Sequence, residues 1–178
     1  PEPEPEPEAP APAAVPAAPG QPELTPFLAS SDPSERKRGI ANLAKRKDDE
    51  AVHLLVWELI HEPDSSVRQV AFDVVNDRWN ERFGDYDELQ RGMVHMTRQA
   101  EVWAVPALRS FARNGSDPRL VEAALHHHAD AVRLAAVEAV AAVRPRAPDG
   151  VDYEALLGHL RDDPNHAVQR KVNQLLAQ

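Results

Sequence analysis

One short sequence phrase recurs along this chain. An acidic residue is followed a few residues later by Val-Arg, and an alanine comes three residues after the arginine. Full copies occupy residues 64–71 and 130–136, and weaker echoes occupy 32–39 and 163–172. The arginine position recurs at 36, 68, 133 and 169, which is a period of about 33 residues with one hidden copy in the middle. Such a period predicts an all-α chain built as a row of stacked helical repeats, an α-solenoid.

The chemistry of the phrase suits the start of a helix. An Asp there accepts hydrogen bonds from free N–H groups of the first turn, and its charge suits the positive end of the helix dipole. The Val and the Ala lie four residues apart, so they share one face. The arginine flanks that face, where we expect it to reach an Asp at the turn of the adjacent repeat. The predicted structural ladder between repeats consists of Asp64, Arg68, Asp130, Arg133 and Asp163.

Composition divides the chain into two parts. Residues 1–26 hold 10 of the 17 prolines and 5 of the 29 acidic residues, without any lysine or arginine. Such a segment cannot form a core, so we expect a disordered, extended spacer. Residues 27–178 form the predicted repeat domain; they keep 24 acidic and 20 basic residues, a net charge of about −4, which does not favour nucleic acid.

The sequence is compatible with more than one cellular compartment and with more than one role for the spacer. The spacer is typical of a tether from a membrane or lipid anchor upstream of Pro1, and equally of a linker between domains. A bacterial cell envelope and the cytoplasm both remain alternatives. Because the first residue is Pro, we expect a processed or trimmed product. The domain has no apolar run near the ~18 residues of a membrane span.

Apolar periodicity and capping signals predict nine helices and no strand. We expect them at residues 33–47, 50–61, 65–78, 86–97, 100–113, 118–127, 130–143, 152–161 and 165–177. The second to the ninth form consecutive pairs, and the first is a leading half-repeat. Pro106 should kink the fifth helix or shift its start. The hidden copy is aligned with Trp103 at the arginine position and Pro106 at the alanine position.

Paired helices whose second member opens with Asp-x-x-Val-Arg-x-x-Ala resemble HEAT repeats of the bacterial HEAT-like type. The resemblance covers residues 32–178 and is carried by residues 64–71 and 130–136. It implies about four and a half repeats whose second helices line a concave face for macromolecular contact. The function it implies is a non-enzymatic scaffold or adaptor for a protein partner, without a cofactor. The alternative is a HEAT-like enzyme or nucleic-acid-processing protein, similar to DNA glycosylases or bilin lyases.

The predicted partner-binding strip lies on the second helices, on the side turned away from the first helices. An apolar strip with a few acids suits a protein partner. The alternative is that its large apolar members simply pack against neighbouring repeats. The strip consists of Gln69, Phe72, Asp73, Asn76, Leu108, Phe111, Leu134, Val137, Glu138, Arg170 and Asn173.

The sequence contains few residue patterns that predict catalysis or metal binding. Without cysteine, thiolate metal sites are excluded. Consecutive helical residues point about 100° apart, so only one or two members of the run 126–128 could join a metal site, and the other histidines add no recognised ligand spacing. Basic residues gather only at 36–38 and 45–47. We interpret them as a solvated end face, with an anionic partner or membrane surface as the alternative.

Overall fold

The computed structural model describes residues 25–114, 118–146 and 152–177, and in these residues the chain is helical without a strand. The elements are α1 (Pro33–Leu43), α2 (Asp49–His61), α3 (Ser65–Glu81), α4 (Tyr86–Gln99), α5 (Glu101–Asn114), α6 (Pro118–Leu125), α7 (Asp130–Val143), the 3₁₀ turn η1 (Arg144–Arg146), α8 (Tyr153–Gly158) and α9 (His166–Leu176). The predicted all-α class is therefore confirmed for the part of the chain that the structure describes.

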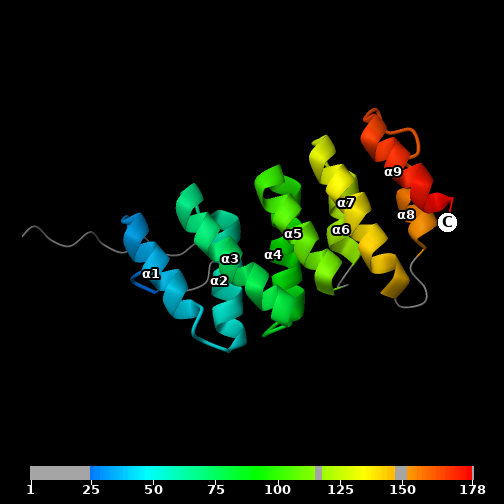
Figure 1. The fold of residues 1–178 in the computed structure, drawn as a ribbon. Helices are drawn as coiled ribbons and strands as arrows, with labels where there is room; N and C mark the ends of the chain where they lie inside the picture. The colour runs from blue at the N-terminus through cyan, green and yellow to red at the C-terminus, as the bar shows by residue number, and fades with distance from the viewer. Residues whose placement is uncertain (1–24, 115–117, 147–151, 178) are drawn as a thin grey trace, which may run out of the picture.

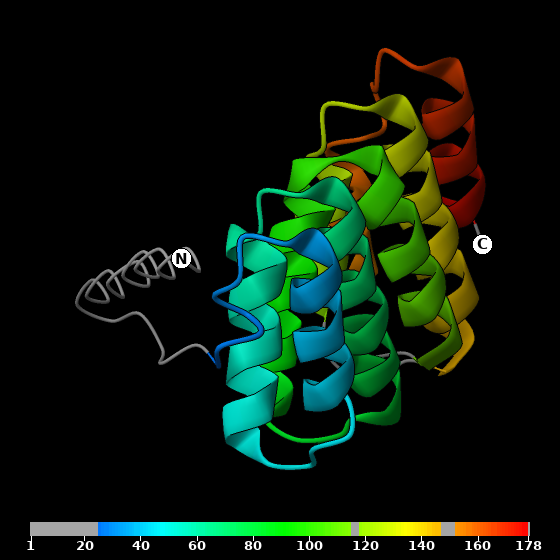
Figure 2. The ribbon, with the colours of Figure 1, turned by 90° about the vertical axis from the view of Figure 1, so that its left-hand side faces the viewer.

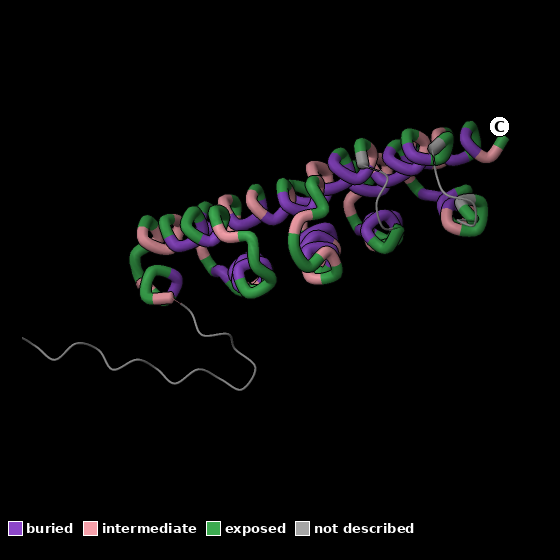
Figure 3. Tube along the Cα trace, turned by 90° about the horizontal axis from the view of Figure 1, so that it is seen from below, coloured by how far each residue is buried: buried purple, intermediate pink, exposed green. Residues whose placement is uncertain are grey.

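The helices form a row of two layers. The odd-numbered layer is α1, α3, α5, α7 and α9, in which each helix packs against the next. The even-numbered layer consists of α2, α4, α6 and α8, and each of these helices also contacts the odd-numbered helix that follows it. Figure 3 shows the two layers from below, with the buried residues turned toward the space between them. Figure 2 looks along the row from its α1 end.

Most helix starts are capped by side chains, as the sequence predicts. The Asp64 carboxylate accepts from the N–H groups of Ser66 and Val67 at 2.8 and 3.1 Å. Two predicted caps are wrong. Ala129 is the cap residue of α7 and makes no side-chain bond, while Asp130 already lies inside the helix. Asn165 caps α9, because Asp163 is taken by a different contact described below.

The hidden repeat lies one residue further along than predicted. In each odd-numbered helix, one residue of the first turn donates its backbone N–H to the carbonyl of the cap residue four positions earlier. That residue is Arg36, Arg68, Arg133 or Gln169 in four of these helices, and in α5 it is Ala104. Trp103 therefore occupies the place of the buried valine, and Ala107 occupies the place of the small alanine. Both are buried in the core. Pro106, expected to mark the alanine position, lies between them inside α5.

Two arginines near the C-termini of odd-numbered helices donate hydrogen bonds to backbone carbonyls at the end of a neighbouring helix in the same layer. Arg78 at the end of α3 is 6% exposed and donates to the carbonyls of Leu43, Ala44 and Arg46, at 2.9 Å for Leu43. Arg144 after α7 donates to the Leu175 carbonyl of α9 at 2.6 Å. Helix C-termini leave carbonyls without partners, so these contacts satisfy them. The helix α1 ends at Leu43, four residues before the predicted end at residue 47.

One core runs the length of the row, between the two layers. The helices α2 and α4 approach closely at Gly92, where an added Cβ would lie 3.2 Å from a Val56 methyl group. None of the described helices has the length and apolar character to cross a bilayer.

Candidate functional site

Three arginines at equivalent positions share one local geometry. Each donates to the two carbonyls that lie two residues and one residue before its own helix cap. Arg36 bonds the carbonyls of Ser30 and Ser31, at 2.9 and 3.1 Å. The other two repeat the arrangement: Arg68 bonds those of Glu62 and Pro63, and Arg133 bonds those of His127 and His128. The arginine therefore fixes the turn between the paired helices.

Two of these arginines also reach the next repeat. Arg133 donates to Asp163 at 2.7 and 3.0 Å, and Arg36 donates to Glu62 at 2.9 and 3.0 Å. Both acids lie two residues before a helix cap, and both accept from the N–H of that cap residue at 2.8 Å. The Arg133 hydrogen bonds hold the pKa of Asp163 below its usual range. The predicted contact between Arg133 and an acid of the adjacent repeat is therefore present. With the Arg36–Glu62 contact, one such Arg–acid bridge lies at each end of the row.

The bridge is interrupted in the middle of the row. In α5 the arginine position holds Ala104, and the acid position, two residues before the Ala100 cap, holds Arg98. Among the described residues Arg68 bonds only the carbonyls of Glu62 and Pro63, so the prediction that it takes part in the ladder between repeats is wrong; the equivalent acid position of the next repeat holds Arg98. The corresponding acid position before α7 holds His127, whose Nδ1 accepts from the Ala129 N–H at 3.0 Å. Asp130 bonds Arg133 within its own helix and accepts from Asn165 across the repeat.

The predicted partner-binding strip does not form an apolar surface. Its members Phe72, Leu108, Phe111 and Val137 are buried and belong to the core, and the Phe72 ring packs against Trp103 of α5. Asn76 and Leu134 are half-buried. The exposed members are all polar: Gln69, Asp73, Glu138, Arg170 and Asn173. The alternative interpretation, packing between neighbouring repeats, describes the apolar members.

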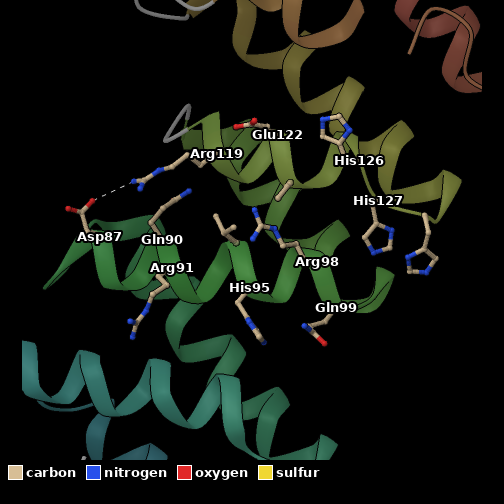
Figure 4. A pocket seen from close by; sticks show the side chains of 13 residues that line it. Asp87, Gln90, Arg91, His95, Arg98, Gln99, Arg119, Glu122, His126 and His127 are labelled. Atoms are coloured by element: carbon tan, nitrogen blue, oxygen red, sulfur yellow. Dashed lines mark ion pairs between the residues drawn. The ribbon is translucent and has the colours of Figure 1, made fainter. Parts of the chain in front are cut away.

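A groove lies instead between α4 and α6, on the even-numbered layer (Figure 4). Its volume is about 1000 Å³. Arginines, histidines and two acids account for most of its lining: Asp87, Arg91, His95, Arg98, Arg119, Glu122, His126, His127 and His128. With neutral histidines the lining carries a formal charge of +1, against −9 for the whole chain. The lining residues thus have a small formal excess of positive charge in an acidic protein, and Glu88, which pairs with Arg91, adds a negative charge beside them.

Two ion pairs hold the arginines on one side of the groove. Arg119 of α6 lies 3.6 Å from Asp87 of α4, and Arg91 pairs with Glu88 one turn earlier. Two buried side chains in the lining have a polar atom without a hydrogen-bond partner, namely Gln90 Nε2 and His127 Nε2. Figure 4 shows Gln90 near Asp87 and Arg119, and His127 at the opposite end of the groove.

Two of the four histidines that line the groove, His95 and His127, are partly or fully withdrawn from solvent, while His126 and His128 are exposed. Burial lowers the pKa of His95 and of His127. His127 stacks on His128, and His126 stacks on His159 of the turn after α8, each at 4.3 Å between ring centroids. In the described part of the chain, no group of three or more histidines or acids is arranged to hold a metal ion. The run 126–128 directly follows the end of α6.

A third buried acid, besides Glu62 and Asp163, is Glu58. Glu58 of α2 is 2% exposed, and its Oε1 has no hydrogen-bond partner. Burial raises its pKa to about 7, with a further contribution from Glu62, while Arg36 acts in the opposite direction. Glu58 thus lies close enough to the Arg36–Glu62 bridge for both charges to affect its pKa.

Sequence reasoning missed the groove. Its arginines belong to α4 and α6, in which the repeated phrase does not occur, and only the run 126–128 drew attention to this region. A further signal was the cationic residue Arg98 at a position that holds an acid in two other repeats.

Comparison with known proteins gave no assignment. No protein-family model matches the chain, and neither the curated proteins nor the solved structures include a significant match.

Proposed function

We propose that this protein is a HEAT-like α-solenoid of about four and a half helical repeats that serves as a non-enzymatic scaffold for a protein partner. The observation that carries the proposal is the two-layered row in which one arginine geometry recurs in three repeats. A row of repeats presents long surfaces made of many helices, which suits extended contact with another macromolecule.

The charge distribution supports a protein partner over a nucleic acid. A nucleic-acid site usually combines a strongly basic surface with aromatic residues that stack on bases. The α4–α6 groove carries two acids among its three arginines, and none of its described lining residues is Phe, Tyr or Trp. The alternative of a HEAT-like enzyme or nucleic-acid-processing protein becomes an outcome of the test.

The test is affinity capture from a lysate of the source organism with the full chain as bait, followed by reconstitution with the purified candidate. We expect one protein in a stoichiometric complex that re-forms from purified components. Two variant baits locate the surface: Asp73→Arg with Glu138→Arg on the odd-numbered layer, and Arg91→Glu with Arg98→Glu in the α4–α6 groove. Capture of nucleic acid by the parent chain, or turnover of a small molecule without a stoichiometric protein partner, would contradict the scaffold function.

A further inference from the structure

The two unpartnered polar atoms in the α4–α6 groove are both donors. Gln90 is 1% exposed, and its Oε1 accepts from Trp79 Nε1 at 2.8 Å, so its amide NH₂ is the group without a partner. His127 is 5% exposed, and its Nδ1 accepts from a backbone N–H. The neutral ring therefore carries its proton on Nε2, the atom without a partner. A buried donor without an acceptor is costly, so both atoms favour a ligand that supplies oxygen acceptors.

The charged groups of the groove favour the same kind of ligand. Arg91, Arg98 and Arg119 are exposed guanidinium groups along the two helices. Arginine binds carboxylates through paired N–H donors. The acids Asp87 and Glu122 moderate the charge, which disfavours a polyphosphate more than a segment with a few carboxylates.

The shape of the groove requires an elongated ligand. Gln90 and His127 lie toward opposite ends, and α4 rises by about 12 Å between Gln90 and Arg98. About four residues of extended chain span that length.

We propose that the α4–α6 groove binds an extended acidic segment of a protein partner. Its Asp or Glu carboxylates pair with Arg91, Arg98 and Arg119, and its oxygens accept from Gln90 and His127. This inference rests on the proposed scaffold function and adds the site and the chemistry of the partner. The groove lies where the Arg–acid bridge is interrupted, since Arg98 and His127 occupy the two bridge positions that hold no acid.

The experiment is a fluorescence-anisotropy titration of labelled octaglutamate with the full chain at low ionic strength, where surface charge pairs are least screened. Octaglutamine is the uncharged probe, and an eight-residue oligothymidylate is the nucleic-acid probe. We expect octaglutamate to bind and to be the tightest of the three. The double variant Arg91→Gln with Arg98→Gln should weaken it about tenfold. The matched double variant Arg38→Gln with Arg109→Gln removes the same charge outside the groove and should change the affinity less than twofold.

A third variant tests the buried donor. His127→Asn keeps an acceptor for the Ala129 N–H and removes the ring donor, so we expect about threefold weaker binding with an unchanged circular dichroism spectrum. Equal weakening by both double variants, equal binding of octaglutamine, or tighter groove binding of oligothymidylate would overturn the inference. If octaglutamate does not bind while the groove variant still captures a stoichiometric partner, the inference fails and the scaffold function stands. If octaglutamate binds the groove while no protein is captured, the groove stands and the scaffold function fails.

Discussion

The ends of the row and its middle use the same turn in different ways. At the α1–α3 and α7–α9 junctions an arginine reaches an acid of the next repeat, and the acid side chains of Glu62 and Asp163 are 1% and 2% exposed. In the middle, Arg68 bonds only the carbonyls of its own turn, and the equivalent acid position of the next repeat holds Arg98. This difference indicates that the arginine has two separable roles: it fixes the turn before its own helix, and it bridges to an acid of the next repeat.

The same difference relates stability to the candidate site. Where the bridge is present, both of its members are withdrawn from solvent. Where it is interrupted, Arg98 and His127 line the α4–α6 groove. We therefore interpret the end junctions as structural and the middle as the part of the row that is available for a ligand.

The largest effect should come from breaking an end bridge. Asp163→Ala leaves the guanidinium of Arg133, 8% exposed, without its buried carboxylate. We expect the free energy of unfolding in urea to fall by about 3 kcal/mol. The exposed neighbour supplies the matched control: Asp162→Ala should change it by less than about 0.5 kcal/mol. A loss below about 1 kcal/mol for Asp163→Ala would mean that the bridge does not hold the last repeat.

The second effect concerns the buried acid beside the other bridge. The pKa of Glu58 is raised to about 7 from an unfolded value near 4.5, so folding favours its protonated form. The stabilisation is complete below pH 4.5 and is lost as the pH rises through 7. The free energy of unfolding of the parent chain should therefore fall between pH 5 and pH 8. In Glu58→Gln this fall should be smaller by about 2 kcal/mol. Urea titrations at the two pH values measure this, and parallel declines in both proteins would contradict it.

A third comparison separates the two roles of the arginine. Arg36→Met leaves the buried Glu62 without its cation and should cost about 3 kcal/mol. Arg68→Met removes only bonds to carbonyls of its own turn and should cost about 1 kcal/mol. Both variants are measured by urea denaturation under the same conditions. Equal losses would show that the bridge contributes nothing beyond fixing the turn.

The smallest effect should come from restoring the interrupted bridge. Arg98→Glu places an acid at the position that holds Glu62 and Asp163 in other repeats, within the next repeat from Arg68. Because this position is exposed, we expect a gain of at most about 1 kcal/mol. Arg98→Gln, which removes the charge without adding an acid, is the control. A clear loss of stability for Arg98→Glu alone would show that residue 98 does not face the arginine of the preceding repeat.

The sequence predicted the regular part of the fold closely. The all-α class and the pairing of helices followed from apolar periodicity and capping residues, and α7 has the bounds expected. The contact between Arg133 and Asp163 followed from the spacing of the repeated phrase. These features depend on residues close together in the chain or on a strict repeat, which is why they could be read without a structure.

The parts that were missed depend on contacts between distant segments. The register of α5 was misplaced by one residue because Trp103 replaces the usual valine and Ala104 replaces the arginine. Burial of Phe72 and Val137 depends on how closely the odd-numbered helices pack, which periodicity alone does not give. The groove combines α4 with α6, and neither helix carries the repeated phrase.

The measurement that tests the account most directly is the octaglutamate titration of Arg98→Glu by fluorescence anisotropy, with circular dichroism to establish that the variant is folded. We expect this one substitution to place an acid at the interrupted α3–α5 junction and, at the same time, to remove one of the three groove arginines. The affinity for octaglutamate should therefore fall by at least about tenfold, while the free energy of unfolding stays the same or rises. Undiminished affinity in a folded variant would contradict the claim that the interrupted bridge makes the middle of the row a binding site.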